Sequence, residues 1–137
     1  MDILGIGTDI VECPRIGKMI EQYGELFLRR IYTPREIRHC HARKHAIEHF
    51  AGRWAAKEAI LKAMGTGPRR GIAWTEIEVR ATEAGQPRVM IGGGAKELAR
   101  ERGIGEILVT IAHCRTYATA YALALAPKPP ASPAAAD

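Results

Sequence analysis

One long helix organises this chain, and its sequence reads Phe50-Ala-Gly-Arg-Trp-Ala-Ala-Lys-Glu-Ala-Ile-Leu-Lys-Ala-Met-Gly-Thr-Gly67. Most of these residues are Ala, Leu, Met, Lys and Glu, which lose little conformational freedom on entering a helix. Gly65, Gly67 and Pro68 come next, and glycine and proline end helices. We therefore predict a helix over residues 44–64.

Two faces of this helix separate at about 100° per residue. Apolar side chains share the first face, namely Ile47, Phe50, Ala51, Trp54 and Leu61, and small residues share the second, namely Gly52, Ala56, Ala59 and Ala63. Glu58 falls in the middle of the apolar face, with Lys62 at its flank. A carboxylate in that position costs several kcal/mol, roughly, unless a cation compensates it. Either Glu58 and Lys62 form an ordinary i,i+4 pair, or Glu58 belongs to a functional site.

Charge is unevenly distributed along the 137 residues. The net charge is +5, and residues 13–53 hold nine Lys or Arg against four Glu, which accounts for all of it. Such a basic segment is explained either by solvation or by an acidic partner. A nucleic-acid partner is not expected, because we find no basic run interleaved with aromatic residues and no DNA- or RNA-binding motif.

The composition, with 47% hydrophobic and 26% charged residues, is typical of one globular domain with a proper core. The three cysteines, Cys13, Cys40 and Cys114, are scattered and odd in number, so we expect reduced thiols. We find neither a signal peptide nor an apolar stretch of membrane-spanning length. A cytoplasmic protein with no membrane partner is therefore the expectation.

The first strand is predicted over residues 3–11, where apolar residues lie on both faces and indicate an interior position. Its glycines, Gly5 and Gly7, would let another element approach the backbone closely. Asp9 lies inside this run and is the second carboxylate in an apolar setting. A strand aspartate is more often a local hydrogen-bond acceptor, but together with Glu58 it suggests a shared hard cation such as Mg²⁺.

Two further helices are predicted, one beginning at Pro14 and one with Thr33 as its N-cap. The segment 39–49 contains four histidines, His39, His41, His45 and His49, of which the last three recur at i, i+4 and i+8. A zinc-binding face is one interpretation. Exposed polar positions on a basic helix are preferred, because the spacing lacks the usual Cys/His pairing and acidic signature of zinc sites.

The rest of the chain alternates between hairpins and one more helix. A glycine-rich loop over 65–71 contains two arginines and exposes backbone N–H groups that suit phosphate, although it is not a Walker A sequence. Strands follow at 74–80 and 88–91, a helix at 95–102, and strands at 106–113 and 117–126. His113 ends a row that we expect to face inward, where a satisfied core histidine competes with a functional one. These elements predict an α+β domain with a mostly antiparallel sheet and helices on one side, and a Pro/Ala-rich disordered tail over 127–137.

Three pieces of this sequence resemble the holo-acyl-carrier-protein synthases, the small bacterial 4′-phosphopantetheinyl transferases. They are Gly5-Ile-Gly-Thr-Asp-Ile-Val11 followed by Arg15, the helix and loop 50–67 quoted above, and a set formed by Trp74-Thr-Glu-Ile-Glu-Val79, Gly85-Gln-Pro87, Ile111-Ala-His113 and Tyr117-Ala-Thr-Ala120. They span residues 3–125 in the order and spacing of that family. The resemblance implies its ferredoxin-like α+β fold over residues 1–126.

The resemblance also implies an activity, namely transfer of the phosphopantetheine arm of coenzyme A to a serine of acyl carrier protein in support of fatty acid biosynthesis, with release of adenosine 3′,5′-bisphosphate. By matching position, Asp9 and Glu58 would bind Mg²⁺ with the pyrophosphate, and Lys62 would stabilise charge on the phosphate. Glu58 would take the serine proton, directly or through a metal-bound water.

The family further implies that Arg53, Gly65, Thr66, Gly67 and His113 contact coenzyme A. Residues Arg15, Lys18 and Met19 would meet the acidic carrier protein, and the family is typically a homotrimer with sites between subunits.

Two departures from the family pattern stand beside His113. Ala112 replaces the usual serine, and Cys114 stands where an acidic residue is common. One hydroxyl contact to coenzyme A is therefore in doubt. Two other classes of function remain open, a non-catalytic module that binds coenzyme A or a carrier protein, and a nucleic-acid-binding domain that only the charge suggests.

Overall fold

The computed structural model describes residues 2–66 and 71–128. The elements in chain order are β1 (Ile3–Glu12), α1 (Cys13–Tyr23), α2 (Glu25–Ile31), α3 (Pro34–His41), α4 (Ala46–Ala63), the 3-10 turn η1 (Trp74–Glu76), β2 (Ile77–Ala81), β3 (Pro87–Ile91), α5 (Gly93–Glu101), β4 (Glu106–His113) and β5 (Tyr117–Leu125). The predicted α+β class and the antiparallel pairing are confirmed.

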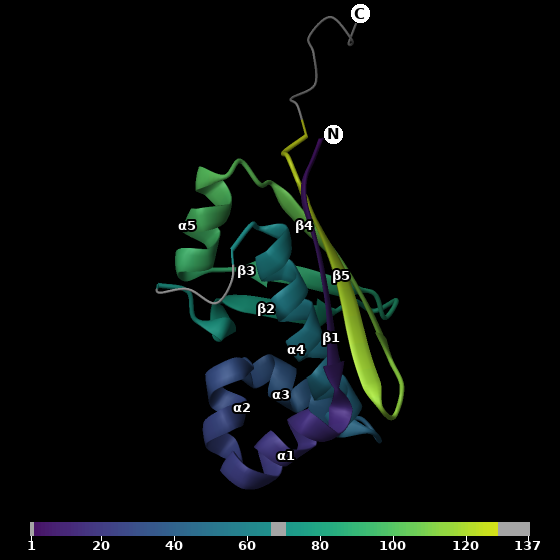
Figure 1. Cartoon of the computed structure of the whole chain (residues 1–137). Helices are drawn as coiled ribbons and strands as arrows, with labels where there is room; N and C mark the ends of the chain where they lie inside the picture. Colours follow the sequence, from purple (N-terminus) through teal and green to yellow (C-terminus); the bar gives the residue numbers. More distant parts are fainter. Residues whose placement is uncertain (1, 67–70, 129–137) are drawn as a thin grey trace, which may run out of the picture.

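Helix α4 lies on one face of a three-stranded antiparallel sheet of order β1-β5-β4, and a two-stranded sheet, β2-β3, lies next to β4 (Figure 1). The single sheet that we expected is therefore two. Helices α1, α2 and α3 gather at one end of the molecule, and α5 lies near the other end, beyond β3 (Figure 1). The sheet joins the two ends of the described chain, because the Ala126 N–H donates to the Asp2 carbonyl at 2.9 Å.

The centre of the interface between α4 and the sheet, along β5, is made of small side chains. The α4 face carries Ala55, Ala56, Ala59 and Ala63, and the β5 face carries Ala118, Ala120, Ala122 and Ala124, all nearly fully buried. The predicted close approach at the β1 glycines is confirmed. A Cβ atom on Gly5 would lie 1.9 Å from the Ala63 carbonyl oxygen, and one on Gly7 would lie 2.0 Å from that of Ala59.

The prediction that β1 is an interior strand is wrong. β1 is an edge strand, and only its odd-numbered side chains face α4. The opposite face of the sheet, which we call the outer sheet face, carries exposed apolar side chains, namely Ile6, Ile10, Leu108, Tyr117 and Tyr121. Ile6 is 67% exposed and Tyr121 is 55% exposed. The sequence showed apolar residues on both faces of β1, but the face that carries Ile6 and Ile10 is uncovered in the single chain.

Local sequence signals explain most element boundaries. Pro14 lies in the first turn of α1, and Gly24, with φ of 53°, ends it. Thr33 caps α3 as predicted, and the structure shows that it does so through a capping box with Glu36. The segment 74–76 was expected to open a strand and instead forms η1, and α5 begins at Gly93, two residues before the predicted start.

Three further expectations concern the cysteines, membrane-spanning helices and the predicted tail and loop. The three cysteines are free. Within the described residues no helix is long and apolar enough to cross a membrane. The predicted tail falls outside the described residues beyond Lys128, and so do Gly67 and the two arginines of the predicted loop.

Candidate active site

Asp9, Glu58 and Lys62 meet where α4 crosses β1, and we call them the Asp9 cluster. The Lys62 ammonium donates to the Thr8 carbonyl at 2.8 Å and to Asp9 Oδ1 at 3.2 Å. Gly7 permits this geometry, because any side chain there would hold the helix away from the strand. The sequence left open an ordinary Glu58–Lys62 pair. Among the described residues, Lys62 instead forms its ion pair with Asp9.

Glu58 is half-buried beside these groups. Burial, followed by the nearby Asp9 carboxylate, raises the pKa of Glu58, and Lys62 opposes the shift. A carboxyl group with a raised pKa is suited to accept a proton near neutral pH. It has no hydrogen bond or ion pair with another residue in the described part of the chain, so its oxygens are available to a ligand.

The Asp9 cluster fits one kind of metal site. Residues 2–66 and 71–128 contain no group of three or more His, Cys, Asp or Glu side chains arranged to hold a metal ion. Two neighbouring carboxylates are nevertheless what Mg²⁺ uses when substrate phosphates and water supply its remaining ligands. Asp9 and Glu58 therefore fit a magnesium ion that arrives with a phosphorylated substrate.

The predicted phosphate loop, residues 65–71, begins three residues after Lys62. Gly65 has φ of 79°, and the N–H groups of Gly65 and Thr66 donate back to Lys62 and Leu61 at 3.0 and 2.9 Å. The arrangement ends the helix and starts the loop beside the Asp9 cluster. Gly67 lies outside the described residues.

His113, at the end of β4, lies beside the start of α4, far from the Asp9 cluster. Its Nδ1 is 2.9 Å from Glu48 Oε1, and its ring lies 4.8 Å from that of His49. Glu48 and Glu58 are ten residues apart on one helix, which corresponds to about 15 Å along the axis. His113 is also partly exposed, so it is not the satisfied core histidine that we weighed.

Arg53 lies near the middle of α4, and its charge acts on His39 and His49 rather than on the Asp9 cluster. It is buried, and its Nε has no hydrogen-bond partner within the described residues. Its charge lowers the pKa of both His39 and His49, although burial is the larger cause in each case. The pKa of His39 falls to about 4. His113 and Arg53 therefore form a second group, separate from the Asp9 cluster in a single chain.

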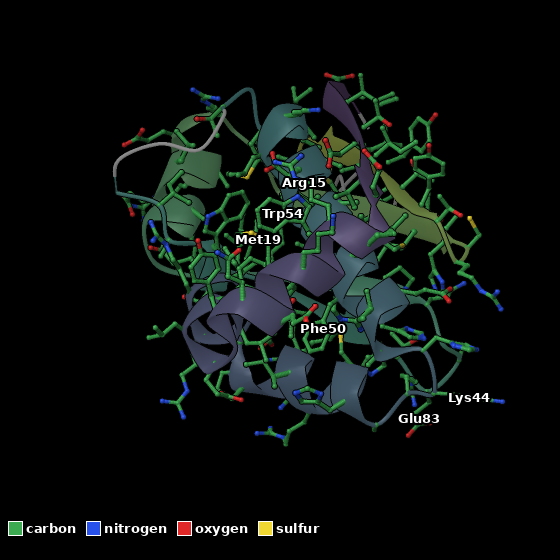
Figure 2. All side chains as sticks on the ribbon, turned by 60° about the horizontal axis from the view of Figure 1, so that its bottom comes forward. Arg15, Met19, Lys44, Phe50, Trp54 and Glu83 are labelled. Carbon is green, nitrogen blue, oxygen red and sulfur yellow. The ribbon has the colours of Figure 1, made fainter. Side chains whose placement is uncertain are left out.

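The candidate carrier-binding residues lie on α1. Arg15 and Lys18 are exposed, and Met19 is half-buried. Figure 2 shows Arg15 and Met19 on the same side of the molecule as Trp54 of α4. Trp54, which we placed on the apolar face of the helix, stacks on Trp74 with ring centroids 5.3 Å apart and remains partly exposed. This side therefore combines cations with apolar surface.

Comparisons with known proteins address the family to which the chain belongs. Residues 5–126 match the 4′-phosphopantetheinyl transferase superfamily. The chain is 46% identical over 118 residues to the holo-[acyl-carrier-protein] synthase of Koribacter versatilis, covering 86% of this chain and 94% of that protein. It is also 46% identical over 121 residues to the same enzyme of Rhodopirellula baltica, covering 88% and 96%. The chain belongs to the holo-acyl-carrier-protein synthase family.

Solved structures of the holo-acyl-carrier-protein synthase family share the fold. The Neisseria meningitidis synthase superposes with a TM-score of 0.83 at 31% identity, covering 90% of this chain and 99% of that one. The Helicobacter pylori synthase, solved in complex with coenzyme A, superposes with a TM-score of 0.78 at 28% identity, covering 88% and 99%. The expected family and fold are confirmed.

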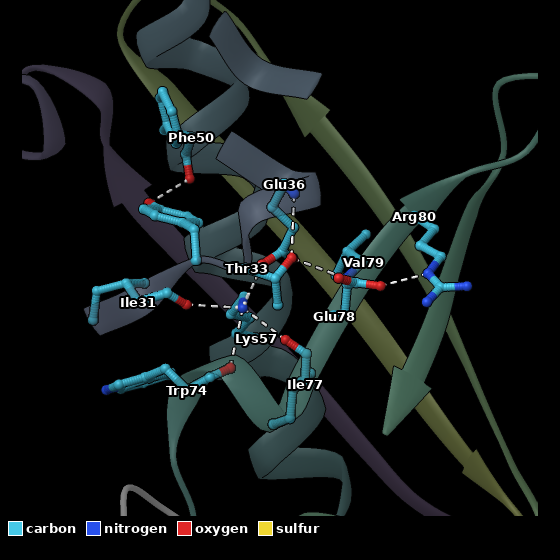
Figure 3. A network of polar contacts seen from close by, with 11 residues as sticks. Ile31, Thr33, Glu36, Phe50, Lys57, Trp74, Ile77, Glu78, Val79 and Arg80 are labelled. Carbon is cyan, nitrogen blue, oxygen red and sulfur yellow. Dashed lines mark hydrogen bonds and ion pairs between the residues drawn. The ribbon is translucent and has the colours of Figure 1, made fainter. Parts of the chain in front are cut away.

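One part of this synthase-family fold escaped the sequence analysis, namely a buried polar network around Lys57 (Figure 3). Lys57 and Glu36 are fully buried, with Nζ and Oε1 2.7 Å apart. Burial lowers the pKa of Lys57, and Glu36 opposes the shift. A signal was present, because Lys57 has the large apolar residues Trp54, Ile60 and Leu61 three or four positions away. Like the Glu58 carboxylate, a cation in that setting costs free energy unless a partner of opposite charge compensates it.

Proposed function

We propose that this chain transfers the 4′-phosphopantetheine arm of coenzyme A to a serine of apo acyl carrier protein. The serine oxygen attacks the phosphorus that carries the pantetheine arm, the P–O bond to the second phosphate breaks, and adenosine 3′,5′-bisphosphate leaves. One observation carries the proposal: the Asp9 cluster is assembled at a glycine-lined crossing of β1 and α4, within a chain that matches this family over residues 5–126.

Each member of the Asp9 cluster has a distinct proposed role. Asp9 and Glu58 hold Mg²⁺, which supplies charge neutralisation at the pyrophosphate when bound. Lys62, already beside Asp9, stabilises negative charge that develops on the phosphate. Glu58 accepts the serine proton, since burial and Asp9 raise its pKa.

The coenzyme A contacts are proposed to come from two places. Gly65, Thr66 and Gly67 follow the Asp9 cluster in its own chain. Arg53 lies near the middle of α4, and His113 of β4 lies beside the start of that helix. About 15 Å of helix separates Glu48, the partner of His113, from Glu58. We propose that His113 serves the Asp9 cluster of a neighbouring copy in a homotrimer.

The outer sheet face supports this assembly. Its exposed isoleucine, leucine and tyrosine side chains form an apolar surface of the kind that monomers seldom expose. A ring of three copies would cover this face on every chain and close without a free edge. The acidic carrier protein is proposed to dock on Arg15, Lys18 and Met19. We also propose that the protein is cytoplasmic and that it acts in fatty acid biosynthesis.

Mass spectrometry of apo carrier protein incubated with coenzyme A and Mg²⁺ tests the reaction. The expected product carries the added phosphopantetheine, and EDTA should abolish its formation. Asp9→Ala or Glu58→Ala should lower turnover by about 100-fold or more, the scale of losing a principal electrostatic stabiliser. Glu97→Ala, on the exposed surface of α5, is the matched control and should act as wild type. Binding of coenzyme A without transfer would instead identify a non-catalytic binding module.

Light scattering after size exclusion tests the assembly, and a monomer mass at working concentration would reject the trimer. Mixing tests the shared site. Glu58→Ala and His113→Ala chains should each have low activity at coenzyme A concentrations well below the raised KM of the His113 variant. Under these conditions they should regain partial activity on co-refolding if the two residues serve one site from different chains. No rescue in confirmed mixed trimers would place each site within one subunit.

A further inference from the structure

The Lys57 network, which we define as Lys57, Glu36 and their hydrogen-bond partners, joins segments that are distant in sequence (Figure 3). Lys57 Nζ donates to the Ile31 carbonyl at 2.9 Å, to that of Trp74 at 3.1 Å and to that of Ile77 at 2.6 Å, besides its contact with Glu36. Four acceptors surround an ammonium group that has three hydrogens, so the cation is fully satisfied.

Glu36 completes the network from the opposite side. Its Oε1 accepts from the Thr33 N–H at 2.9 Å, and its Oε2 accepts from the Val79 N–H at 2.8 Å. The partners therefore come from α2, the start of α3, η1 and β2, and all of them converge on one residue of α4. Neither charged group is left without compensation.

Stability alone does not account for this arrangement. A buried ion pair can often be replaced by apolar residues of similar volume at no loss of stability, because desolvation cancels much of the attraction. Apolar residues do not reproduce the directional requirement of the hydrogen bonds. A fully satisfied polar network tolerates one arrangement of its partners, whereas apolar contacts tolerate several.

Along β5, the packing of α4 on the sheet defines the rotation of the helix only weakly. Both surfaces there consist of alanine methyl groups, which form shallow ridges and grooves, and the larger side chains of Val11, Ile107 and Ile111 border them on β1 and β4. The contacts at Gly5 and Gly7 fix how close the helix lies to β1. They do not by themselves fix which way its remaining side chains point.

Lys57 immediately precedes Glu58, and the two project about 100° apart around the helix, with Lys62 about 140° from Lys57. A rotation of about 20° would move groups at the helix surface, about 5–6 Å from its axis, by about 2 Å. The contact of 3.2 Å between Lys62 and Asp9 would not survive such a shift. We propose that Lys57, through its pairing with Glu36, is a positioning residue that sets the rotation of α4 and so holds Glu58 and Lys62 against Asp9.

This inference rests on the proposed function for its kinetic test, in which the network is replaced by apolar residues. The double variant Lys57→Met/Glu36→Leu removes both charges and keeps the volume. We expect it to fold with a melting temperature close to wild type, to lower kcat by about 10-fold or more, and to leave KM for the carrier protein unchanged, since misplacement of about 1 Å can cost about 100-fold. The single variant Lys57→Met should be strongly destabilised, because it leaves Glu36 buried and unpaired.

The matched control is Glu97→Leu/Arg100→Met, which replaces an exposed ion pair on α5 by the same two apolar residues. It should leave kcat and the melting temperature unchanged. A double variant of Lys57 and Glu36 with wild-type kcat would overturn the proposal. So would a double variant that does not fold, because the pair would then serve stability rather than position.

A readout that needs no activity separates this inference from the proposed function. A crystal structure of the double variant should show Lys62 Nζ and Asp9 Oδ1 more than 4 Å apart, and retention of the contact at 3.2 Å would overturn the proposal. If wild-type protein does not modify carrier protein, the proposed function fails, and the crystal structure still decides whether Lys57 positions α4.

Discussion

Replacing Gly7 by alanine is the sharpest test of how β1 and α4 build the Asp9 cluster. A Cβ atom there would lie 2.0 Å from the Ala59 carbonyl oxygen and 2.7 Å from the Ala63 nitrogen. Both are helix backbone atoms, so no side-chain rotation can relieve the clash. Ordinary contact begins at 3.4 Å, and α4 must therefore withdraw from β1 by about 1.4 Å, the difference between 3.4 and 2.0 Å.

Two consequences of this withdrawal can be measured. Overpacking of this kind costs about 1–3 kcal/mol or more, which for a domain of this size lowers the melting temperature by about 3–15 °C. The withdrawal also lengthens the contact of 3.2 Å between Lys62 and Asp9, so we expect turnover to fall by about 100-fold. Thermal unfolding and initial rates of carrier-protein modification, taken well below the melting temperature of the variant, give the two values.

The control is Gly92→Ala, because Gly92 has negative φ and no heavy atom lies within 4 Å of the position of its Cβ. It should leave turnover near wild type. Wild-type turnover and melting temperature for Gly7→Ala would refute the claim that the glycine sets the distance between helix and strand. A lower melting temperature with unchanged turnover would refute the coupling of that distance to catalysis.

Three further predictions concern charge. Arg15→Glu should raise KM for the carrier protein, and His113→Ala should raise KM for coenzyme A; equal effects on both substrates would mean that the two surfaces are misassigned. Glu58→Gln should abolish turnover yet raise the melting temperature at neutral pH. The pKa of Glu58 in the folded state lies above the ordinary 4.5, so the free energy of unfolding of wild type increases as the pH falls through the raised pKa towards 4.5. Urea unfolding across that pH range should show this dependence in wild type and not in the variant. Folding lowers the pKa values of His39 and His49, so as the pH falls these side chains are protonated in the unfolded chain before they are protonated in the folded one. The free energy of unfolding should therefore fall as the pH is lowered from 6.5 towards about 4, and the double variant His39→Gln/His49→Gln should show a smaller fall.

Features that depend on neighbouring residues in sequence were predictable. Helix α4 was expected over 44–64 and spans Ala46–Ala63, since helix formers followed by glycine and proline define both its body and its end. The Thr33 cap and the Pro14 start rest on equally local rules. Gly5 and Gly7 were expected to admit another backbone, and the structure identifies that backbone as α4.

Features that depend on distant pairing were not predictable. Nothing in residues 3–11 tells an edge strand from an interior one, because that distinction depends on β5 lying between β1 and β4. The same limit applies to His113, whose contact with Glu48 is set by where β4 ends beside α4. The apolar neighbours of Lys57 signalled its burial, but its partners were not predictable, because they come from four separated segments that no single stretch of sequence records.

The order of strands has a consequence for how the chain is made. β5 is the last of the described strands to be synthesised, yet it is the central strand to which both β1 and β4 are hydrogen-bonded, and Ile3 pairs with Leu125. At a synthesis rate of about 5–20 residues per second, β1 waits for several seconds or longer before its partner exists. Its apolar residues and the alanine face of α4 are uncovered during that wait, so nascent chains are the form most exposed to aggregation and to chaperones. Pairing across nearly the whole chain also predicts slow folding for a domain of this length.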